Sequence, residues 1–415
     1  MQTLEHHTPN GSVHGTYEAR FAAVAQAFID NFEQHGEVGA AVNLHIAGQP
    51  VVDLWGGTRD TRSGAPWERD TLCVVYSTTK GMVALAAHTL ISAGALDVDA
   101  PVHDYWPEFA ANGKQDATVK MMLDHSVGVP CLREPLPDGS CCDWDYVVGR
   151  LEQEAPFWTP GTRNGYHMMT FGWTVGELIR RVSGQSLGSY FRSVLAEPLD
   201  AECWIGLPES LEDRVAPMIP FRPEKGAPIG AFTAALINDR QSIAALALFN
   251  NGGFNPNSRA CHAAEIGGGG GIANARGLAR LYAPFACGGS LDGVQYVTPD
   301  SLARMQEVAV ATHEDATLLL PTRFSLGFMK SMDNRREQAV TKDSVILGAQ
   351  AFGHVGAGGS IGFADPTFGL SMGYTMNRMG PGILLNPRGQ ALVDAAYQSL
   401  GCDSNRAGYW LKTVA

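Results

Sequence analysis

A serine and a lysine three residues apart are the strongest candidates for chemistry in this sequence. Ser77 and Lys80 stand just before an apolar run that begins at Met82 and predicts a buried helix. If that helix begins near Ser77, its 3.6-residue period brings the lysine ammonium over the serine hydroxyl. A desolvated lysine loses its proton more readily, and it can then activate the serine as a nucleophile.

The place of this pair at the start of a helix adds a second useful feature. Free backbone N–H groups and the positive end of the helix dipole lie there, and both stabilise an oxyanion. The alternative makes Ser77 a helix cap and Lys80 a solvated first-turn residue. Lys80 is the only one of seven lysines with a serine three positions before it. Because an unpaired lysine is unusual at the start of a buried helix, we favour the catalytic interpretation.

Proton transfer between a serine and a leaving group needs a third group, and Tyr166 is the candidate. It follows the turn-rich segment 160–165 and precedes a predicted helix that begins at Phe171. A loop tyrosine in this place can reach a cleft between two lobes. The alternative interpretation is an ordinary packing tyrosine.

A glycine-rich strand, residues 352–360, is the third candidate region. A strand with many glycines lets a ligand approach its backbone, and its N–H groups can complete an oxyanion hole with that of Ser77. His354 lies within this strand. It is either a pocket residue or a structural histidine, and the sequence leaves both open.

The composition excludes several classes of partner. The chain has 415 residues and a net charge of −12, which argues against binding to nucleic acid or to an anionic membrane. No apolar stretch reaches the ~18–20 residues of a membrane-spanning helix. The first fifteen residues lack the apolar core of a secretory signal. We therefore expect a cytoplasmic enzyme with a small-molecule substrate, and the sequence leaves its oligomeric state open.

The cysteines and histidines do not form a recognisable metal motif. The eight cysteines are expected to be reduced thiols, because no secretory signal accompanies them. Cys141 and Cys142 are adjacent, which is unfavourable for a structural disulfide. Neither His-Glu-x-x-His nor a pair of Cys-x-x-Cys motifs occurs, so we expect no metal site and no cofactor.

The predicted elements favour an α+β fold with two lobes. Apolar alternation predicts a hairpin in 39–55 and further strands at 324–329, 345–347, 352–355, 360–364 and 370–377. The helical period predicts helices in 17–36, 77–94, 119–124, 171–182, 187–195, 239–249, 275–284, 301–308 and 390–400. Strands at both ends with helices between them indicate one antiparallel sheet and an inserted helical lobe.

Three further segments invite functional interpretations. Ser186 and Ser360 each lie in a Gly-x-Ser-x-Gly string, but a nucleophile elbow needs a strand before the serine and a helix after it. Neither place meets this condition, so neither serine is the expected nucleophile. The five glycines at 267–271 lack the Gly-Lys-Ser/Thr ending of a phosphate loop, and we expect them to form a mobile cleft edge.

The order of these motifs resembles that of the serine β-lactamase fold. The three segments 77–80, 166–168 and 354–356 are similar to the three motifs of class C β-lactamases, family VIII carboxylesterases and related acyltransferases. The segments 123–130 and 158–161 also match. The resemblance covers roughly residues 17–400. It implies an α/β lobe with an antiparallel sheet, residues 1–76 and 265–415, a mainly helical lobe, residues 77–264, and an active site between them.

The resemblance also implies roles for individual residues. Ser77 would be the acylated nucleophile, Lys80 the general base or proton relay, and Tyr166 the partner that shuttles the proton between Ser77 and the leaving group. The backbone N–H groups of Ser77 and Ala357 would form the oxyanion hole. The implied pocket residues are Met168, His354, Gly356 and Trp158.

Two departures from the class C pattern bear on the substrate. Met168 replaces an asparagine that would hold an amide side chain, and His354 replaces a lysine that would meet a substrate carboxylate. Both favour a neutral ester over a β-lactam. The sequence thus predicts a serine carboxylesterase for neutral, short-chain esters. The alternatives are an acyltransferase, an amidase or peptidase for D-residues, a weak β-lactamase and, from a different class, a catalytically silent scaffold.

Overall fold

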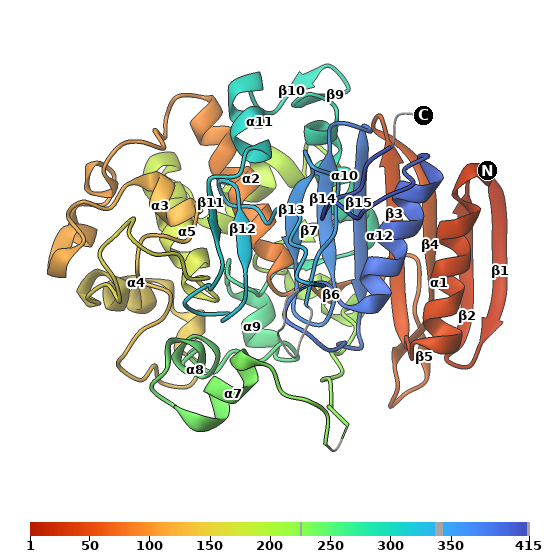
Figure 1. The fold of residues 1–415 in the computed structure, drawn as a ribbon, viewed down its shortest axis with the longest axis horizontal. Coiled ribbons are helices and arrows are strands. Elements are labelled where there is room, and N and C mark those ends of the chain that lie inside the picture. Colours follow the sequence, from red (N-terminus) through yellow and green to blue (C-terminus); the bar gives the residue numbers. More distant parts are fainter. Residues whose placement is uncertain (225, 337–342, 413–415) are drawn as a thin grey trace.

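An antiparallel sheet occupies one side of the molecule, and most of the helices gather on the other (Figure 1). The computed structural model describes residues 1–224, 226–336 and 343–412. The N-terminus and the last helix, Pro387–Ser399, both lie on the side of the sheet (Figure 1). This mixed α+β architecture is the fold class that the sequence predicts.

The main sheet joins the beginning of the chain to its end. Its order is β1-β2-β4-β3-β15-β14-β13, with β5 beside β4, and each pair is antiparallel. The junction is the pairing of β3 with β15, in which Ala40 lies opposite Met376. The strands of this sheet are β1 Gln2–Thr8, β2 Gly11–Tyr17, β3 Gly39–Ile46, β4 Gln49–Asp60, β5 Ala65–Pro66, β13 Phe352–Val355, β14 Ile361–Asp365 and β15 Leu370–Met376.

Short strands complete the inventory of β structure. β6 and β7 both pair with β8, β9 pairs with β10, and β11 pairs with β12. The bounds of these strands are β6 Cys73–Val74, β7 Cys203–Trp204, β8 Ile272–Ala273, β9 Ser290–Leu291, β10 Val294–Gln295, β11 Val310–Thr312 and β12 Thr322–Phe324.

Helices cover both faces of the main sheet, and adjacent residues of β14 show this. A side chain at Gly362 would meet Tyr282 of α10, while the ring of Phe363 stacks 6.3 Å from that of Tyr397 in α12. Neighbouring strand residues point to opposite faces, so α10 and α12 cover different faces. The α-helices are α1 Ala22–Gln34, α2 Thr78–Ser92, α3 Val119–Leu123, α4 Trp144–Gln153, α5 Thr170–Ser183, α6 Leu187–Phe191, α7 Ala231–Asn238, α8 Ile243–Phe249, α9 Arg259–Ala263, α10 Ala275–Ala286, α11 Pro299–Gln306 and α12 Pro387–Ser399.

Helix α2 runs through the centre of the molecule, where β structure and helices meet. Every residue from Thr78 to His88 is buried, so the helix is apolar on nearly all sides instead of amphipathic. It packs against α5 and α6 in the helical part and against β13 in the sheet. A side chain in its first turn is therefore enclosed from both sides. Within the described residues, no helix combines the length and apolarity needed to cross a bilayer.

Several predicted elements need correction. The hairpin of β1 and β2 was not predicted, because this edge of the sheet is largely exposed and carries little apolar alternation. Helix α4, whose first turn is capped by the Asp143 side chain, lies where no helix was predicted. Residues 345–347 form only an isolated bridge to Met332 and no strand. The predicted helix 239–249 begins later, at Ile243.

Candidate active site

The backbone just before Ser77 adopts a left-handed conformation. Tyr76 has a φ of +46°, which costs a residue with a side chain roughly 1–3 kcal/mol. The Thr79 hydroxyl holds this turn, because it donates to the Tyr76 carbonyl at 2.5 Å and accepts from the Gly271 N–H at 2.8 Å. The sharp turn sets Ser77 at the mouth of α2 with its side chain half-buried.

Lys80 lies one turn into α2 and reaches back to Ser77. Its Nζ donates to Ser77 Oγ at 3.0 Å and to the carbonyls of Met168 and Gly268, each at 2.6 Å. An ammonium would use all three as acceptors, whereas a neutral amine keeps its two N–H bonds on the carbonyls and turns its lone pair to the Ser77 hydroxyl. No carboxylate pairs with Lys80 among the described residues. The lysine is therefore held against the serine by neutral groups alone.

This environment favours the neutral amine. Lys80 is fully buried, and burial lowers its pKa well below the usual value for lysine. A carboxylate close by would oppose this shift, and none does. A neutral Lys80 can accept the proton of the Ser77 hydroxyl.

Tyr166 lies on the other side of Lys80. The lysine Nζ is 4.7 Å from the centre of the tyrosine ring. The phenol is 3% exposed, and burial raises its pKa, while the neighbouring Ser77 hydroxyl acts in the opposite direction. The phenol makes no hydrogen bond of regular geometry within the described part of the chain. It remains protonated at neutral pH and has an unused donor beside the serine.

The Tyr166 ring is enclosed by three other rings. His125 lies 5.0 Å away, Phe324 stacks at 6.0 Å with an interplanar angle of 12°, and His354 lies at 6.0 Å. Burial lowers the pKa of His354 to about 3 and that of His125 well below its usual value. Both histidines are therefore neutral at pH 7, and they enclose the tyrosine without adding charge.

Asp315 holds the backbone of Tyr166, and the sequence did not single it out. Its two carboxylate oxygens accept from the Tyr166 N–H at 2.9 and 3.0 Å. The same carboxylate accepts from the N–H groups of Thr317 and Leu318 and from the Thr322 hydroxyl. Burial raises the pKa of Asp315, and these hydrogen bonds act against that shift. Asp315 contacts no reacting group, so it is a positioning residue for Tyr166.

The two predicted oxyanion donors are free. Neither the N–H of Ser77 nor that of Ala357 donates to another described residue. Ala357 follows Gly356, where an added Cβ would lie 2.1 Å from the Val75 carbonyl oxygen. Glycine at this position lets the end of β13 approach the turn before Ser77.

Ser77 opens into a small apolar cavity of about 140 Å³. Ser77 and Tyr166 supply its hydroxyl groups, and no charged side chain lines it. The remaining lining residues are Met168, Phe232, Leu248, Leu318, Met329, Val355, Ala357, Gly382 and Ile383.

Some of the predicted site residues line one cavity in the structure, and others lie outside its lining. Ser77, Tyr166, Met168 and Ala357 line one cavity, and Lys80 lies directly beneath it. Three other predicted residues, His354, Gly356 and Trp158, do not line the cavity. The Trp158 indole donates to the Ser126 carbonyl at 3.0 Å, and its ring lies 6.2 Å from that of His167, the neighbour of Tyr166. His354 is 1% exposed, and its Nδ1 donates to the Val355 carbonyl.

The two alternative serines have other partners. Ser186 caps α6 and donates to Glu265 at 2.7 Å. Ser360 is buried, donates to the Val75 carbonyl at 2.8 Å and lies 3.1 Å from the Thr78 hydroxyl. The glycine run 267–271 is fully buried, so the expectation of a mobile cleft edge was wrong. Within this run, the backbone of Gly268 packs closely against Gly172 of α5, and the Gly268 carbonyl accepts the hydrogen bond from Lys80.

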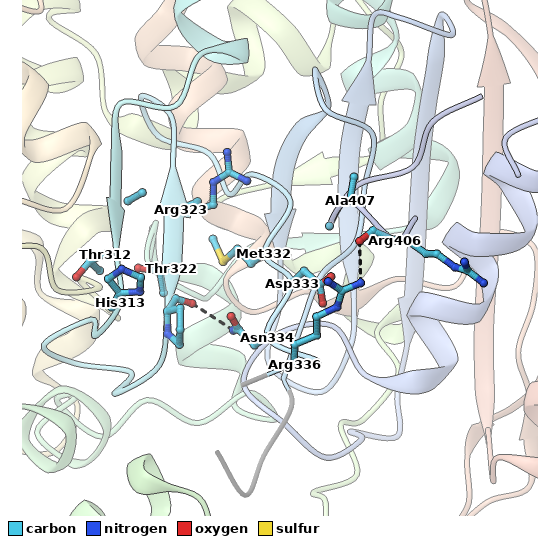
Figure 2. A pocket seen from close by; sticks show the side chains of 13 residues that line it. Thr312, His313, Thr322, Arg323, Met332, Asp333, Asn334, Arg336, Arg406 and Ala407 are labelled. Atoms are coloured by element: carbon cyan, nitrogen blue, oxygen red, sulfur yellow. Dashed lines mark hydrogen bonds between the residues drawn. The ribbon is translucent and has the colours of Figure 1, made fainter. Parts of the chain in front are cut away.

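A larger cavity, of about 410 Å³, lies elsewhere (Figure 2). Its lining includes Arg323, Arg336 and Arg406, and none of its residues lines the Ser77 cavity. Figure 2 shows hydrogen bonds from Arg336 to the Arg406 carbonyl and from Asn334 to the Pro321 carbonyl. No hydroxyl-lysine pair is present there, so the chemistry belongs to the smaller cavity.

Comparison with known proteins identifies relatives over nearly the whole chain. The family model described as Beta-lactamase matches residues 22–396. The Esterase/beta-lactamase LipL of Mycobacterium tuberculosis is 33% identical over 96% of this chain and 90% of its own length. A family VIII carboxylesterase of known structure is 38% identical, with a TM-score of 0.81 over 93% of this chain and 99% of that one. A penicillin-binding protein homologue from Caulobacter crescentus is 36% identical, with a TM-score of 0.83 and the same shares of coverage.

The matched region covers both the sheet and the helices. It includes the buried serine–lysine pair, which is consistent with these relatives. The resemblance to family VIII carboxylesterases that the sequence motifs indicated is confirmed. The chain therefore belongs to the Beta-lactamase family, and within that fold it is a serine hydrolase of the esterase type.

Proposed function

We propose that the protein is a carboxylesterase that hydrolyses neutral, short-chain esters through an acyl-enzyme on Ser77. The observation that carries this proposal is the 3.0 Å hydrogen bond from Lys80 Nζ to Ser77 Oγ in a site without a carboxylate. A neutral lysine at this distance is a competent general base.

The first half-reaction follows from the positions of these groups. Ser77 Oγ attacks the ester carbonyl carbon while its proton passes to Lys80 Nζ. The oxygen of the tetrahedral intermediate becomes negative and accepts hydrogen bonds from the free N–H groups of Ser77 and Ala357. Tyr166 donates its phenol proton to the departing alkoxide and recovers a proton from the Lys80 ammonium. The products are an alcohol and acyl-Ser77.

The second half-reaction reverses these roles. Water takes the place of the alcohol, and Tyr166 and Lys80 accept its proton as it attacks the acyl carbon. The same two N–H groups hold the second oxyanion. Collapse returns the proton to Ser77 Oγ and releases the carboxylic acid, so the site ends in its starting protonation state.

The cavity favours a small acyl group. A cavity of roughly 150 Å³ in another protein holds one benzene molecule, and the Ser77 cavity has about 140 Å³. This volume accommodates an acyl chain of about six heavy atoms or fewer. The lining side chains are apolar, so the acyl group gains free energy by leaving water.

The same cavity disfavours a substrate with a carboxylate. No charged side chain lines it, and His354 is neutral with a pKa of about 3. An unpaired carboxylate there would lose its hydration without compensation. The relative LipL bears the name esterase/beta-lactamase, so a β-lactam is the informative comparison substrate.

The proposed lobes also fit the cavity. Ser77, Tyr166 and Phe232 come from the segment 77–264, while Leu318 and Ala357 come from the segment 265–415. This lining supports the division of the chain into one lobe of residues 1–76 with 265–415 and another of residues 77–264, with the substrate between them. We propose that this boundary is the substrate entrance.

The decisive experiment compares Ser77→Ala with Ser186→Ala. Nitrophenyl acetate, butyrate and octanoate are assayed on each variant, with a cephalosporin in parallel. We expect Ser77→Ala to lose turnover and Ser186→Ala to keep it, with acetate and butyrate faster than octanoate and the cephalosporin slowest. A serine-reactive phosphonate should add one mass increment to the wild type and none to Ser77→Ala. Labelling of Ser77→Ala, or a faster rate on the cephalosporin, would contradict the proposal.

A further inference from the structure

Three cysteine thiols from distant parts of the sequence meet in the helical region. Cys141 and Cys142 lie in the 3₁₀ turn Ser140–Cys142, and Cys261 lies in α9. The sulfur of Cys141 is 3.9 Å from that of Cys142 and 4.0 Å from that of Cys261. All three sulfurs lie within 4.8 Å of one another. This is the one such group of three ligand-type side chains within the residues that the structure describes.

The size of this triangle fits a common ion better than a covalent bond. Sulfurs bound at about 2.3 Å from one metal ion in trigonal or tetrahedral geometry stand about 3.8–4.0 Å apart. A disulfide requires about 2.05 Å. The two sulfur pairs that contain Cys141 already have the spacing of metal ligands. The sulfurs of Cys142 and Cys261 lie within 4.8 Å of each other, so a rotation of the exposed Cys142 side chain would bring all three sulfurs to one ion.

The surrounding backbone holds the thiols in place. The Gly252 carbonyl accepts from the N–H groups of both Gly139 and Cys141. The Ser258 hydroxyl caps α9 by accepting from the Cys261 N–H at 3.4 Å. The Asn255 N–H donates to the Cys261 sulfur at 3.4 Å. Such an N–H group stabilises a thiolate once its proton has left.

The group is also open to solvent on one side. Cys141 and Cys261 are buried, while Cys142 is exposed. A cavity of about 260 Å³ leads to Cys141 and Cys142, and Asp145 and Glu265 line it as well. Both acids are already engaged, Asp145 with Arg180 and Glu265 with Ser186 and Gly188. The fourth ligand of an ion at this place would therefore come from solvent.

We propose that Cys141, Cys142 and Cys261 bind one soft d¹⁰ cation of the Zn²⁺ class, with a water molecule as the fourth ligand. Thiolate sulfur is the ligand that such ions prefer. Each thiol gives its proton to solvent when it coordinates, so binding converts three neutral thiols into thiolates. The ion would tie the 3₁₀ turn to α9, which are separated in the sequence by the whole of α4 to α8. This site is independent of the Ser77 chemistry.

The test is a titration of the intact protein with Cd²⁺. The protein is first freed of metal with a chelator and reduced with a phosphine. We expect thiolate-to-cadmium charge-transfer absorption that saturates at one equivalent, and a higher melting temperature with Zn²⁺, because an ion that binds the folded state stabilises it. Cys142→Ser and Cys261→Ser should each weaken Cd²⁺ binding at least tenfold. Cys131→Ser, which removes another buried thiol, should bind as the wild type does.

Two results would overturn the proposal. One is the absence of saturable absorption in the reduced wild type. The other is equal Cd²⁺ binding by Cys142→Ser and Cys131→Ser, which would mean adventitious binding elsewhere. Cys142 is exposed, so this comparison remains decisive even if Cys261→Ser does not fold.

Discussion

Two buried lysines, Lys80 and Lys114, have nearly the same acceptors and very different surroundings. Each is almost completely buried and donates to backbone carbonyls. Lys114 gives all three of its hydrogen bonds to carbonyls, those of Ala111, Glu152 and Glu154. Lys80 gives its third to the hydroxyl of Ser77.

The pKa values of the two lysines diverge because of the acids around them. Burial lowers the pKa of Lys114 to about 8, and the carboxylates of Glu154 and Glu152 limit the decrease. Burial lowers the pKa of Lys80 well below its usual range, with no carboxylate to oppose it. Burial alone therefore does not make a base. A catalytic lysine also needs a hydroxyl within reach and no acid beside it.

Replacement of each lysine by methionine should separate the two roles most clearly. We expect Lys80→Met to lower kcat/KM for nitrophenyl butyrate by about four orders of magnitude, because the base is lost. Lys114→Met should keep activity within about threefold. It should lower the free energy of unfolding by about 1–3 kcal/mol, because three carbonyls lose their donor. A Lys80→Met variant that remains active, or a Lys114→Met variant that folds but is inactive, would contradict the assignment of Lys80 as the catalytic lysine and Lys114 as a structural one.

The second expected effect concerns Tyr166 as the partner of Lys80. We expect Tyr166→Phe to lower kcat by roughly 10²–10³-fold, because the proton shuttle is lost. If the lysine and tyrosine act as one unit, the double variant Lys80→Met/Tyr166→Phe should be hardly slower than Lys80→Met alone. Tyr190→Phe serves as the control, since the Tyr190 hydroxyl bonds Thr89 away from the cavity. Losses that multiply in the double variant would argue for independent roles.

The third effect tests whether Asp315 influences catalysis by positioning Tyr166. Asp315→Asn places an amide where a carboxylate now accepts several N–H groups. We expect kcat to fall roughly 10–100-fold with little change in KM, the usual scale for a residue that orients another. Burial is the main cause of the raised pKa of Tyr166, and the negative charge of Asp315 adds to it, so loss of this charge should move the alkaline limb of the pH profile to lower pH. An unchanged profile with reduced stability would mean that Asp315 has only a structural role.

The fourth and smallest effect extends the comparison to a buried base without a catalytic partner. Burial lowers the pKa of His88 to about 4, and its Nε2 donates to the Leu326 carbonyl at 2.9 Å. The folded-state pKa lies below the unfolded value of about 6.5. The stability from neutral His88 is therefore complete above pH 6.5 and is lost as the pH falls through the window from 6.5 to 4.

Denaturant unfolding at two pH values measures this term. We expect His88 to account for a loss of about 0.7 kcal/mol between pH 7 and pH 6. His88→Gln should reduce the loss by that amount, while His103→Gln, at a more exposed position, should leave it unchanged. An equal pH dependence in both variants would exclude His88 as the source.

The sequence predicts those parts of the molecule whose signals are local. Ser77 and Lys80 share one turn of a helix, so their spacing alone places them together. The strand Phe352–Val355 was predicted with its observed bounds, because the glycines at 356, 358 and 359 mark its end clearly. The edge hairpin β1–β2 was missed, because its strands have little buried surface to impose alternation.

Partners that lie far apart in the chain could not be found in this way. Asp315 meets Tyr166 only because the fold brings the segment before β12 to the loop before α5. The Gly268 carbonyl is a backbone atom, so no residue type marks it as an acceptor for Lys80. The spacing of Cys142 and Cys261 matches no metal motif, since the two are joined by packing and not by one loop. Such contacts depend on tertiary structure, which single-sequence periodicity does not encode.

The pairing of β3 with β15 has a consequence for the order in which the protein forms. During synthesis the β3–β4 hairpin leaves the ribosome before β15, which pairs with the other edge of β3 and follows the other strands of the sheet in the chain. Until then that edge offers unpaired N–H and C=O groups to other nascent chains. The central sheet can close only after translation has passed Met376, so β3 must wait for its second partner while the whole helical part of the chain is synthesised. A truncated chain that ends before β15 should aggregate.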